Sequence, residues 1–347
     1  MSPAPPEIAF RLWGFPQPAA IHPLSGGQSG ARVWRVDLAR AHVGHRDSPP
    51  YRVPSRVVLR CERPGRPATS LIAERQQMLC VAASHDELIF NPDPRRLPLP
   101  HYYDAERATA GSHAMLANGV ESSVWTDSSG CRWTVEAFVA GEPTLSERLG
   151  LLPDALARLG VVHARIASFR GRHLKPRRRL SPTIAERIGV AESLPPDAHP
   201  MLASTLRRLR EQAGEVCDQH AIWKDLWAAH VLIGDDDAIG FIDAGAASVD
   251  HWSVDIARLL GSLPPIDADL REAALVAYAE ARAPKHRERK TLLTAANREG
   301  IDVLERSGVL LASLRWQRRG EHPLKAERLR QLGERMAAWS WPFEPPA

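Results

Sequence analysis

A change in apolar pattern at Gly141 is the feature that most limits what this 347-residue chain can fold into. Before it, short runs rich in apolar and β-branched residues, such as 32–36, 56–60 and 132–139, are typical of strands. After it, apolar residues recur at helical spacing, beginning with 151–169. We therefore predict an α+β protein with two lobes, a β-rich N-lobe and a helical C-lobe.

The same pattern predicts where the parts begin and end. Residues 1–20 are proline-rich and read as an irregular lead-in, 21–139 as the β-rich lobe and 140–347 as the helical lobe. A long exposed loop is expected between two strands, over 41–55. Helices are expected at 70–83, 151–169, 201–220, 254–263, 270–281 and 292–314.

Two aspartates stand beside short apolar runs in the second half of the chain. Asp225 precedes Val231-Leu-Ile233, and Asp243 directly follows 239–242, with a turn-like segment at 234–237 between the runs. One hairpin would hold both carboxylates at its open ends. That arrangement suits phosphoryl transfer, in which one carboxylate orients the attacking hydroxyl and another holds magnesium. Because aspartate favours turns, a purely solvated hairpin is an equally open interpretation.

A glycine-rich turn lies between an expected strand and the run 32–36. Gly26, Gly27 and Gly30 let the backbone approach a phosphate closely, so that peptide N–H groups can bind it. The segment is not a P-loop, because no Gly-Lys-Ser/Thr follows and no helix is expected to begin there. An ordinary hairpin turn remains the alternative.

Composition excludes several classes of protein. Hydrophobic residues make up 44% and charged residues 25% of the chain, which is typical of globular proteins. No apolar run approaches the roughly 18 residues that cross a bilayer, and the N-terminus lacks a signal-peptide pattern, so we expect a cytoplasmic protein that does not enter the membrane. The cysteines show no C-x-x-C pair and are expected to be reduced packing residues: Cys61, Cys80, Cys131 and Cys217.

The net charge of +4 fits an anionic ligand without requiring one. Basic stretches at 170–179 and 315–319 could meet nucleic acid, but we favour a solvated face or the rim of an anionic site. With a further basic run at 285–290, the helical lobe would repel a polycationic substrate. A neutral or anionic hydroxyl compound is therefore the expected acceptor. Oligomeric state is left open.

The order of these features, over about residues 20–265, resembles the aminoglycoside-phosphotransferase and choline-kinase-like branch of the protein-kinase-like superfamily. Phe138-Val-Ala-Gly-Glu142 is similar to the family's F-x-x-G-E motif. Leu159-Gly-Val-Val-His163 is similar to its L-x-x-L-H helix, and the stretch 254–260 is similar to the helix start D-[LI]-A. The resemblance implies a two-lobed protein-kinase-like fold and ATP-dependent transfer of a phosphoryl group.

The resemblance also implies a role for individual residues. Asp225 would orient the acceptor hydroxyl and Lys224 would help neutralise the phosphate, while Asp243 and His230 would bind magnesium, with manganese as a possible substitute. Asp255 would fix the catalytic loop. The resemblance further implies that Gly26, Gly27 and Gly30 cover the phosphates of the nucleotide. Arg60 would bind these phosphates and Glu74 would form an ion pair with Arg60. Glu136 and Phe138 would belong to the hinge that binds adenine.

Three positions depart from the family pattern. Trp223 replaces the histidine that braces the loop, Arg60 replaces the phosphate-gripping lysine, and His230 replaces an asparagine that binds the metal. Arginine keeps its charge but needs a different pocket, and imidazole is a poorer ligand than a carbonyl oxygen for magnesium. The alternative to an active phosphotransferase is therefore a pseudokinase that binds nucleotide or ligand. Trp223 and Trp227 could stack on a sugar ring, or could be core residues.

Overall fold

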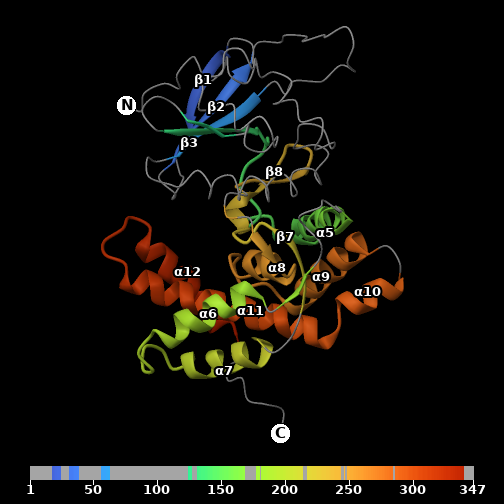
Figure 1. Ribbon diagram of the computed structural model, residues 1–347, viewed down its shortest axis with the longest axis vertical. Helices are drawn as coiled ribbons and strands as arrows, with labels where there is room; N and C mark the ends of the chain where they lie inside the picture. The colour runs from blue at the N-terminus through green and yellow to red at the C-terminus, as the bar shows by residue number, and fades with distance from the viewer. Residues whose placement is uncertain are drawn as a thin grey trace. The chain divides into compact units, whose positions relative to one another are not determined.

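The computed structural model describes residues 18–24, 31–38, 56–62, 124–126, 131–168, 177–179, 181–213, 217–243, 246, 248–283 and 286–339. The chain divides into two compact units, Met1–Val139 and Ala140–Ala347. The first contains strands in its described part and the second is mainly helical, so the predicted α+β fold with a β-rich N-terminal region and a helical C-terminal region is confirmed (Figure 1).

The N-terminal unit contains a five-stranded antiparallel sheet in the order β1-β2-β3-β5-β4. Its strands are β1 Pro18–Leu24, β2 Arg32–Leu38, β3 Arg56–Glu62, β4 Val124–Thr126 and β5 Arg132–Ala137. Successive residues of a strand face opposite sides of the sheet, and β3 buries Val57, Leu59 and Cys61 on one side. The indoles of Trp34 and Trp133 stack among the buried residues, with ring centroids 5.4 Å apart.

The C-terminal unit is built mainly from helices, and its described part also contains a three-stranded and a two-stranded sheet (Figure 1). Its helices are α5 Leu152–Ser168, α6 Pro182–Glu192, α7 Leu202–Ala213, α8 Ser253–Leu260, α9 Ala268–Arg282, α10 His286–Leu292, α11 Ala295–Arg318 and α12 Lys325–Ala337, with 3₁₀ turns η3 Leu149–Leu151 and η4 Ala228–His230. Its strands are β6 Arg177–Arg179, β7 Cys217–Ile222, β8 Val231–Ile233, β9 Ile239–Phe241 and β10 Ser248–Asp250.

Helix α11 is the centre of this unit and contacts α6, α7, α8 and α12. Helices α5 and α9 form a second packed pair, and they lie so close that glycine is needed at their crossing. A Cβ atom added at Gly160 would lie 2.5 Å from the carbonyl oxygen of Tyr278. This contact explains the glycine in the segment Leu159-Gly-Val-Val-His163.

The hairpin predicted around 231–242 is confirmed, because Val231 pairs with Phe241 and Ile233 with Ile239 in antiparallel register. Glu142 forms an isolated bridge to Ile233. Gly141 precedes it with a φ of +127°, and a Cβ there would lie 2.8 Å from the backbone of Ile233. The F-x-x-G-E motif thus has a structural reason in this chain, since only glycine fits this close approach at positive φ.

Several sequence predictions are corrected. The helix predicted over 201–220 ends at Ala213, and β7 follows it, because that segment pairs with β6 and β10. The strand predicted over 132–139 ends at Ala137, and β1 begins inside the predicted lead-in, at Pro18. The helix predicted over 292–314 is α11, which begins at Ala295 and continues to Arg318. Helices α6, α10 and α12 were not predicted, and the predicted helix 70–83 and loop 41–55 lie outside the described residues.

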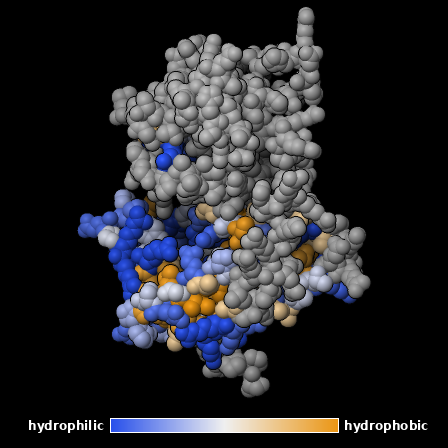
Figure 2. Space-filling view, viewed as in Figure 1, coloured by the Kyte–Doolittle hydropathy of each residue, from blue (hydrophilic) through white to orange (hydrophobic). Residues whose placement is uncertain are grey.

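Cys61 and Cys131 are buried thiols outside any disulfide, as predicted, while Cys80 lies outside the described residues. Burial raises the pKa of the Cys61 thiol to about 11, which makes it an unreactive packing residue. Among the described helices, none is both long and apolar enough to cross a membrane. On the face seen in Figure 2, hydrophilic residues cover much of the described surface of the C-terminal unit, with apolar residues between them.

Candidate active site

The loop that follows β7 carries the candidate catalytic residues, and Asp255 on α8 holds it in place. The Asp255 carboxylate accepts hydrogen bonds from the backbone N–H groups of Trp223, at 2.9 Å, and Lys224, at 2.7 Å. Lys224 has a φ of 63°, a conformation that a residue with a side chain rarely adopts. These bonds offset the backbone strain, and the predicted role of Asp255 in fixing the loop is confirmed by them.

Behind Asp255, a chain of buried polar groups leads away from the loop. His163 Nε2 lies 3.1 Å from Asp255 Oδ2, and His163 Nδ1 lies 2.9 Å from the hydroxyl of Tyr278. Arg282 donates to the same hydroxyl oxygen at 2.5 Å. The tyrosine therefore donates its proton to Nδ1, and Nε2 donates to the carboxylate. The chain orients His163 and so supports the group that holds the loop.

Burial sets the protonation of this chain. It lowers the pKa of His163 well below the usual value, helped by the positive charge of Arg282. It also raises the pKa of Asp255 to about 7, against the opposing effect of the N–H groups of Trp223 and Lys224. His163 is thus a neutral donor at physiological pH.

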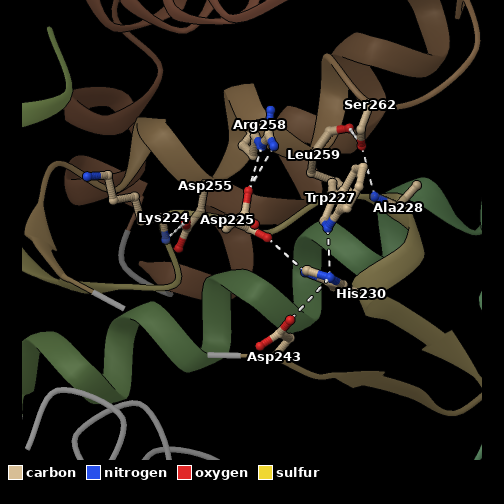
Figure 3. A network of polar contacts seen from close by, with 10 residues as sticks. All are labelled: Lys224, Asp225, Trp227, Ala228, His230, Asp243, Asp255, Arg258, Leu259 and Ser262. Atoms are coloured by element: carbon tan, nitrogen blue, oxygen red, sulfur yellow. Dashed lines mark hydrogen bonds and ion pairs between the residues drawn. The ribbon is translucent and has the colours of Figure 1, made fainter. Parts of the chain in front are cut away.

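Asp225, the predicted catalytic residue, is held through one oxygen of its carboxylate. Arg258 on α8 donates to Oδ1 from Nε at 3.1 Å and from Nη2 at 2.8 Å (Figure 3). No residue in the described ranges donates to Oδ2. The Asp225 side chain is 42% exposed, so one carboxylate oxygen is oriented and the other can meet a ligand.

Lys224, predicted to help neutralise a phosphate, forms an ion pair with Glu186 on α6. The Nζ atom lies 3.0 Å from Oε2 of Glu186, and both side chains are at least one-third exposed. Exposed pairs of this kind contribute little to stability and exchange partners easily. The predicted contact of Lys224 with a phosphate stays a prediction.

His230, predicted to bind the metal, uses both ring nitrogens for contacts inside the protein. Nδ1 donates to the backbone carbonyl of Asp225 at 2.8 Å, and Nε2 accepts a hydrogen bond from the indole N–H of Trp227 at 2.7 Å (Figure 3). Burial lowers the pKa of the ring, which agrees with a neutral imidazole. A neutral imidazole has a single acceptor nitrogen, and Trp227 occupies it. A metal at Nε2 would have to displace the indole.

Asp243, the other predicted metal ligand, follows β9 with a φ of 56°. Its Oδ2 lies 3.7 Å from Nε2 of His230, too far for a hydrogen bond. The backbone N–H of Ile242 donates to the carbonyl of His230 at 3.0 Å, which joins the end of the hairpin to the catalytic loop. The structure thus brings Asp225, His230 and Asp243 together around one hairpin.

The two tryptophans beside Asp225 have different surroundings. Trp223 is 2% exposed and packs its ring edge against Phe241, so it is a core residue that does not stack on a ligand. Trp227 is partly buried, and the guanidinium groups of Arg258 and Arg328 lie 5.5 and 4.7 Å from its ring centroid.

Of the predicted nucleotide-binding residues, Arg60 and Phe138 have described side chains. Arg60 lies on β3 opposite Thr134 of β5, on the side of the sheet that does not carry Leu59. The guanidinium groups of Arg35 and Arg56 each lie 5.7 Å from the ring centroid of Phe138.

For the remaining predicted residues the structure describes less. The backbone of Glu136 pairs with Val58, but its side chain lies outside the described set. Four residues lie wholly outside the described ranges: Gly26, Gly27, Gly30 and Glu74. Their predicted roles in binding a nucleotide stay predictions.

Sequence reasoning missed two residues at this site, Arg258 and Arg328. Arg258 lies within the stretch 254–260 that carried the family resemblance, and its position one helical turn after Asp255 places it on a neighbouring part of the helix surface. That spacing could have identified it. Arg328 belongs to α12, which was not predicted, and no local signal points to it.

Comparison with known proteins agrees with this geometry. The family model described as the phosphotransferase enzyme family (APH) matches residues 20–290. A search of curated protein sequences finds no match.

Solved structures that resemble the chain share its fold at low sequence identity. The GDP complex of wild-type aminoglycoside 2′-phosphotransferase-IIIa aligns with a TM-score of 0.56 and 11% identity, over 92% of this chain and 93% of that one. A choline/ethanolamine kinase family protein from Mesorhizobium loti aligns with a TM-score of 0.54 and 15% identity, over 93% and 89%. A thermostable mutant of aminoglycoside phosphotransferase APH(4)-Ia, in a ternary complex with ADP and hygromycin B, aligns with a TM-score of 0.52 and 14% identity, over 96% of each chain.

The family match covers well over half of the chain, and the segment 20–290 contains every residue of the candidate active site except Arg328. This family and its fold support a small-molecule phosphotransferase activity. The chain belongs to the phosphotransferase enzyme family, APH.

Proposed function

We propose that the protein transfers the γ-phosphoryl group of ATP to a hydroxyl of a neutral or anionic small molecule. The observation that carries this proposal is the setting of Asp225. Its carboxylate is fixed through Oδ1 by Arg258 and keeps Oδ2 for a ligand, in a loop that Asp255 and His230 hold from two sides. Precise positioning of reacting groups supplies most of the catalysis in phosphoryl transfer.

In the proposed reaction, the acceptor hydroxyl donates a hydrogen bond to Oδ2 of Asp225 and its oxygen attacks the γ-phosphorus. The bond from the γ-phosphorus to the bridging oxygen breaks, and ADP leaves. The hydroxyl proton passes to Asp225 and then to solvent. Lys224 directly precedes Asp225 in the same loop. Its ammonium group would leave Glu186, bind the transferred phosphate and partly neutralise the charge of that phosphate.

Asp243 fits the role of magnesium ligand, because its partly exposed carboxylate offers the hard oxygen atoms that this cation prefers. A magnesium ion bound there would neutralise the phosphates. Within the described ranges no group of three or more His, Cys, Asp or Glu residues could hold a metal alone, so nucleotide phosphates would supply further ligands. Because the Nε2 lone pair of His230 is engaged by Trp227, we give His230 the role of positioning the Asp225 loop.

The test of this proposal is Asp225→Asn, which keeps the shape of the side chain and removes its charge. We expect the rate of nucleotide turnover to fall by about 100- to 10,000-fold, the usual contribution of a general base, with nucleotide affinity nearly unchanged. Asp235→Asn is the matched control, since Asp235 is exposed on the turn of the same hairpin. Full activity in Asp225→Asn would show that this carboxylate takes no part in the chemistry.

A pseudokinase that binds nucleotide without turnover is the second candidate. It is favoured by the contacts of His230, whose acceptor nitrogen is occupied where the family pattern has a metal-binding asparagine. This candidate predicts stabilisation by nucleotide and no turnover with magnesium or manganese. Nucleotide hydrolysis that is lost in Asp243→Ala would rule it out.

A further inference from the structure

Two guanidinium groups lie close to the indole of Trp227, two residues after the candidate catalytic Asp225. Arg258 belongs to α8 and Arg328 to α12, and their Cζ atoms lie 5.5 and 4.7 Å from the ring centroid of Trp227. Both contacts are within the range of cation–π interactions. Segments far apart in the sequence thus bring two cations beside the same aromatic ring at the active site.

Among the described residues, the positive charges beside Trp227 outnumber the negative charges that pair with them. Arg258 pairs with Asp225. Arg328 forms no ion pair with any residue in the described ranges, and its hydrogen-bond partner is the neutral amide oxygen of Gln331, at 3.2 Å. Its sequence neighbour Glu327 binds Arg330 and Gln331 instead. One partly buried guanidinium beside Trp227 is therefore left without an opposite charge among the described residues.

The surroundings of Arg328 make its unpaired positive charge energetically unfavourable when no ligand is bound. Partial burial and the positive charge of Arg258 lower the pKa of Arg328, and Glu327 opposes this shift only in part. Moving a cation from water into such a place is unfavourable unless an anion or hydrogen bonds compensate. A ligand anion would supply this compensation. Arginine suits the task because its planar fork binds carboxylate or phosphate through two parallel hydrogen bonds.

We propose that Arg328, with Trp227 and Arg258, binds an anionic group on the phosphoryl acceptor, a carboxylate or a phosphate monoester. The proposal rests on the function proposed above and names its acceptor class. Arg258 has a double task, since it fixes Oδ1 of Asp225 and adds to the positive field. An acceptor anchored there by its anion would present a nearby hydroxyl to Oδ2 of Asp225.

The test compares acceptors that differ only in charge: glycerol with glycerate and glycerol 3-phosphate, and glucose with gluconate. Choline and hygromycin B serve as cationic acceptors. We expect the anionic member of each set to give the highest kcat/KM. Equal or higher values for the neutral or cationic compounds would overturn the proposal.

Arg328→Gln and Arg330→Gln form the matched pair of variants. Both remove one positive charge from α12, but Arg330 is exposed and pairs with Glu327 and Glu334. We expect Arg328→Gln to raise KM for the anionic acceptor by about 10- to 100-fold, the usual contribution of a charged hydrogen bond, with a smaller change in kcat. Arg330→Gln should leave both values unchanged. Equal behaviour of the two variants would overturn the proposal.

The anion could instead be a phosphate of the nucleotide, and KM for ATP distinguishes the two sources. The proposal expects that Arg328→Gln leaves KM for ATP unchanged. A rise in KM for ATP without a rise for the acceptor would assign Arg328 to the nucleotide and reject an acceptor site.

Binding of inorganic phosphate, measured by thermal shift at constant ionic strength without nucleotide, separates this proposal from the proposed phosphotransferase function. Stabilisation by phosphate that is lost in Arg328→Gln and kept in Arg330→Gln would support the anion site even if no acceptor were turned over. No phosphate stabilisation of the wild type would count against the anion site, whatever the protein does with ATP. Arg328→Lys, which keeps the charge and loses the fork, should bind phosphate with intermediate affinity.

Discussion

Asp225 is oriented by two contacts, one to its carboxylate and one to its backbone. Arg258 binds its carboxylate, and His230 binds its backbone carbonyl. Trp223, which replaces the family's bracing histidine, is a packing residue with its ring against Phe241. In this chain the loop is therefore held by Asp255 and His230, so the fold tolerates the replacements at positions 223 and 230.

Three buried or partly buried histidines of the C-terminal unit make the stability of the protein depend on pH. Burial lowers the pKa of His251 to about 3 and lowers those of His163 and His220 well below 6.5. Below pH 6.5 the unfolded chain takes up three protons at these positions that the folded protein does not bind. Asp255 acts in the opposite direction between about pH 4 and 7, because its raised pKa keeps a proton on the folded protein that the unfolded chain has lost. At about pH 5, these four groups together give the unfolded chain about two more protons than the folded protein.

We therefore expect the free energy of unfolding to fall as pH falls below 6.5, by about 3 kcal/mol per pH unit once the unfolded histidines are fully protonated. The measurement is the urea midpoint between pH 7.5 and pH 5. His251→Gln should reduce the slope, because one of the three protons is then no longer taken up. A midpoint that stays constant over this range would show that these histidines are protonated in the folded protein.

At the scale of elements, α8 holds the catalytic loop at three places along its length. Asp255 binds the loop at the start of the helix, Arg258 binds Asp225 in the next turn, and the Ser262 hydroxyl just beyond the helix accepts from the N–H of Ala228 at 2.8 Å. Figure 3 shows these contacts on one side of the loop and His230 on the other. A helix packed against α11 thus positions the Asp225 carboxylate.

Helices α5 and α9 carry the chain of groups behind Asp255, and their close crossing can be tested. Gly160→Ala would place a Cβ 2.5 Å from the carbonyl oxygen of Tyr278, so the helices must separate. We expect a loss of about 1–3 kcal/mol in the free energy of unfolding, as for other overpacked sites. Gly189→Ala in α6 is the control, because no atom lies within 4 Å of the added Cβ and helix propensity should give a gain of about 0.5–1 kcal/mol. Equal effects of the two substitutions in urea titrations would contradict the close packing.

Sequence pattern identified several elements by their apolar residues and left others unpredicted. Helix α5 and the β8–β9 hairpin were predicted from their apolar residues. Helix α12 is mostly polar, and its buried residue is Arg335, which forms an ion pair with Glu305 of α11. Leu329, Leu332 and Met336 recur at helical spacing in α12, so this helix could have been predicted from its sequence. The ion pair of Arg335 and the position of Arg328 beside Trp227 depend on tertiary contacts and required the structure.

The strand β7 shows a second limit. Its segment continues the helical spacing of α7, but it pairs with β6 and β10 instead, and this long-range pairing overrides the local pattern. Gly214, directly after the last residue of α7, is the local signal that could have marked the end of the helix.

For the whole molecule, the order of motifs was more informative than any single motif. The sequence predicted the family and the fold. It did so because the strands, the hairpin and the helix after the hairpin follow one another in the order that one architecture requires. It also predicted Asp225 and Asp243 as neighbours of one hairpin. The contacts that orient Asp225 depend on side chains brought together by the fold, and these contacts required the structure.

The most direct measurement of the central claim is thermal stabilisation by ATP with magnesium, for the wild type and for Asp243→Ala. ATP at about 100 times its Kd should stabilise the wild type by about 2.7 kcal/mol. This stabilisation should be lost in Asp243→Ala and kept in Asp235→Ala, the exposed acidic residue on the same hairpin. Equal stabilisation of all three proteins, or none with any nucleotide and metal, would contradict a magnesium-dependent nucleotide site at Asp243.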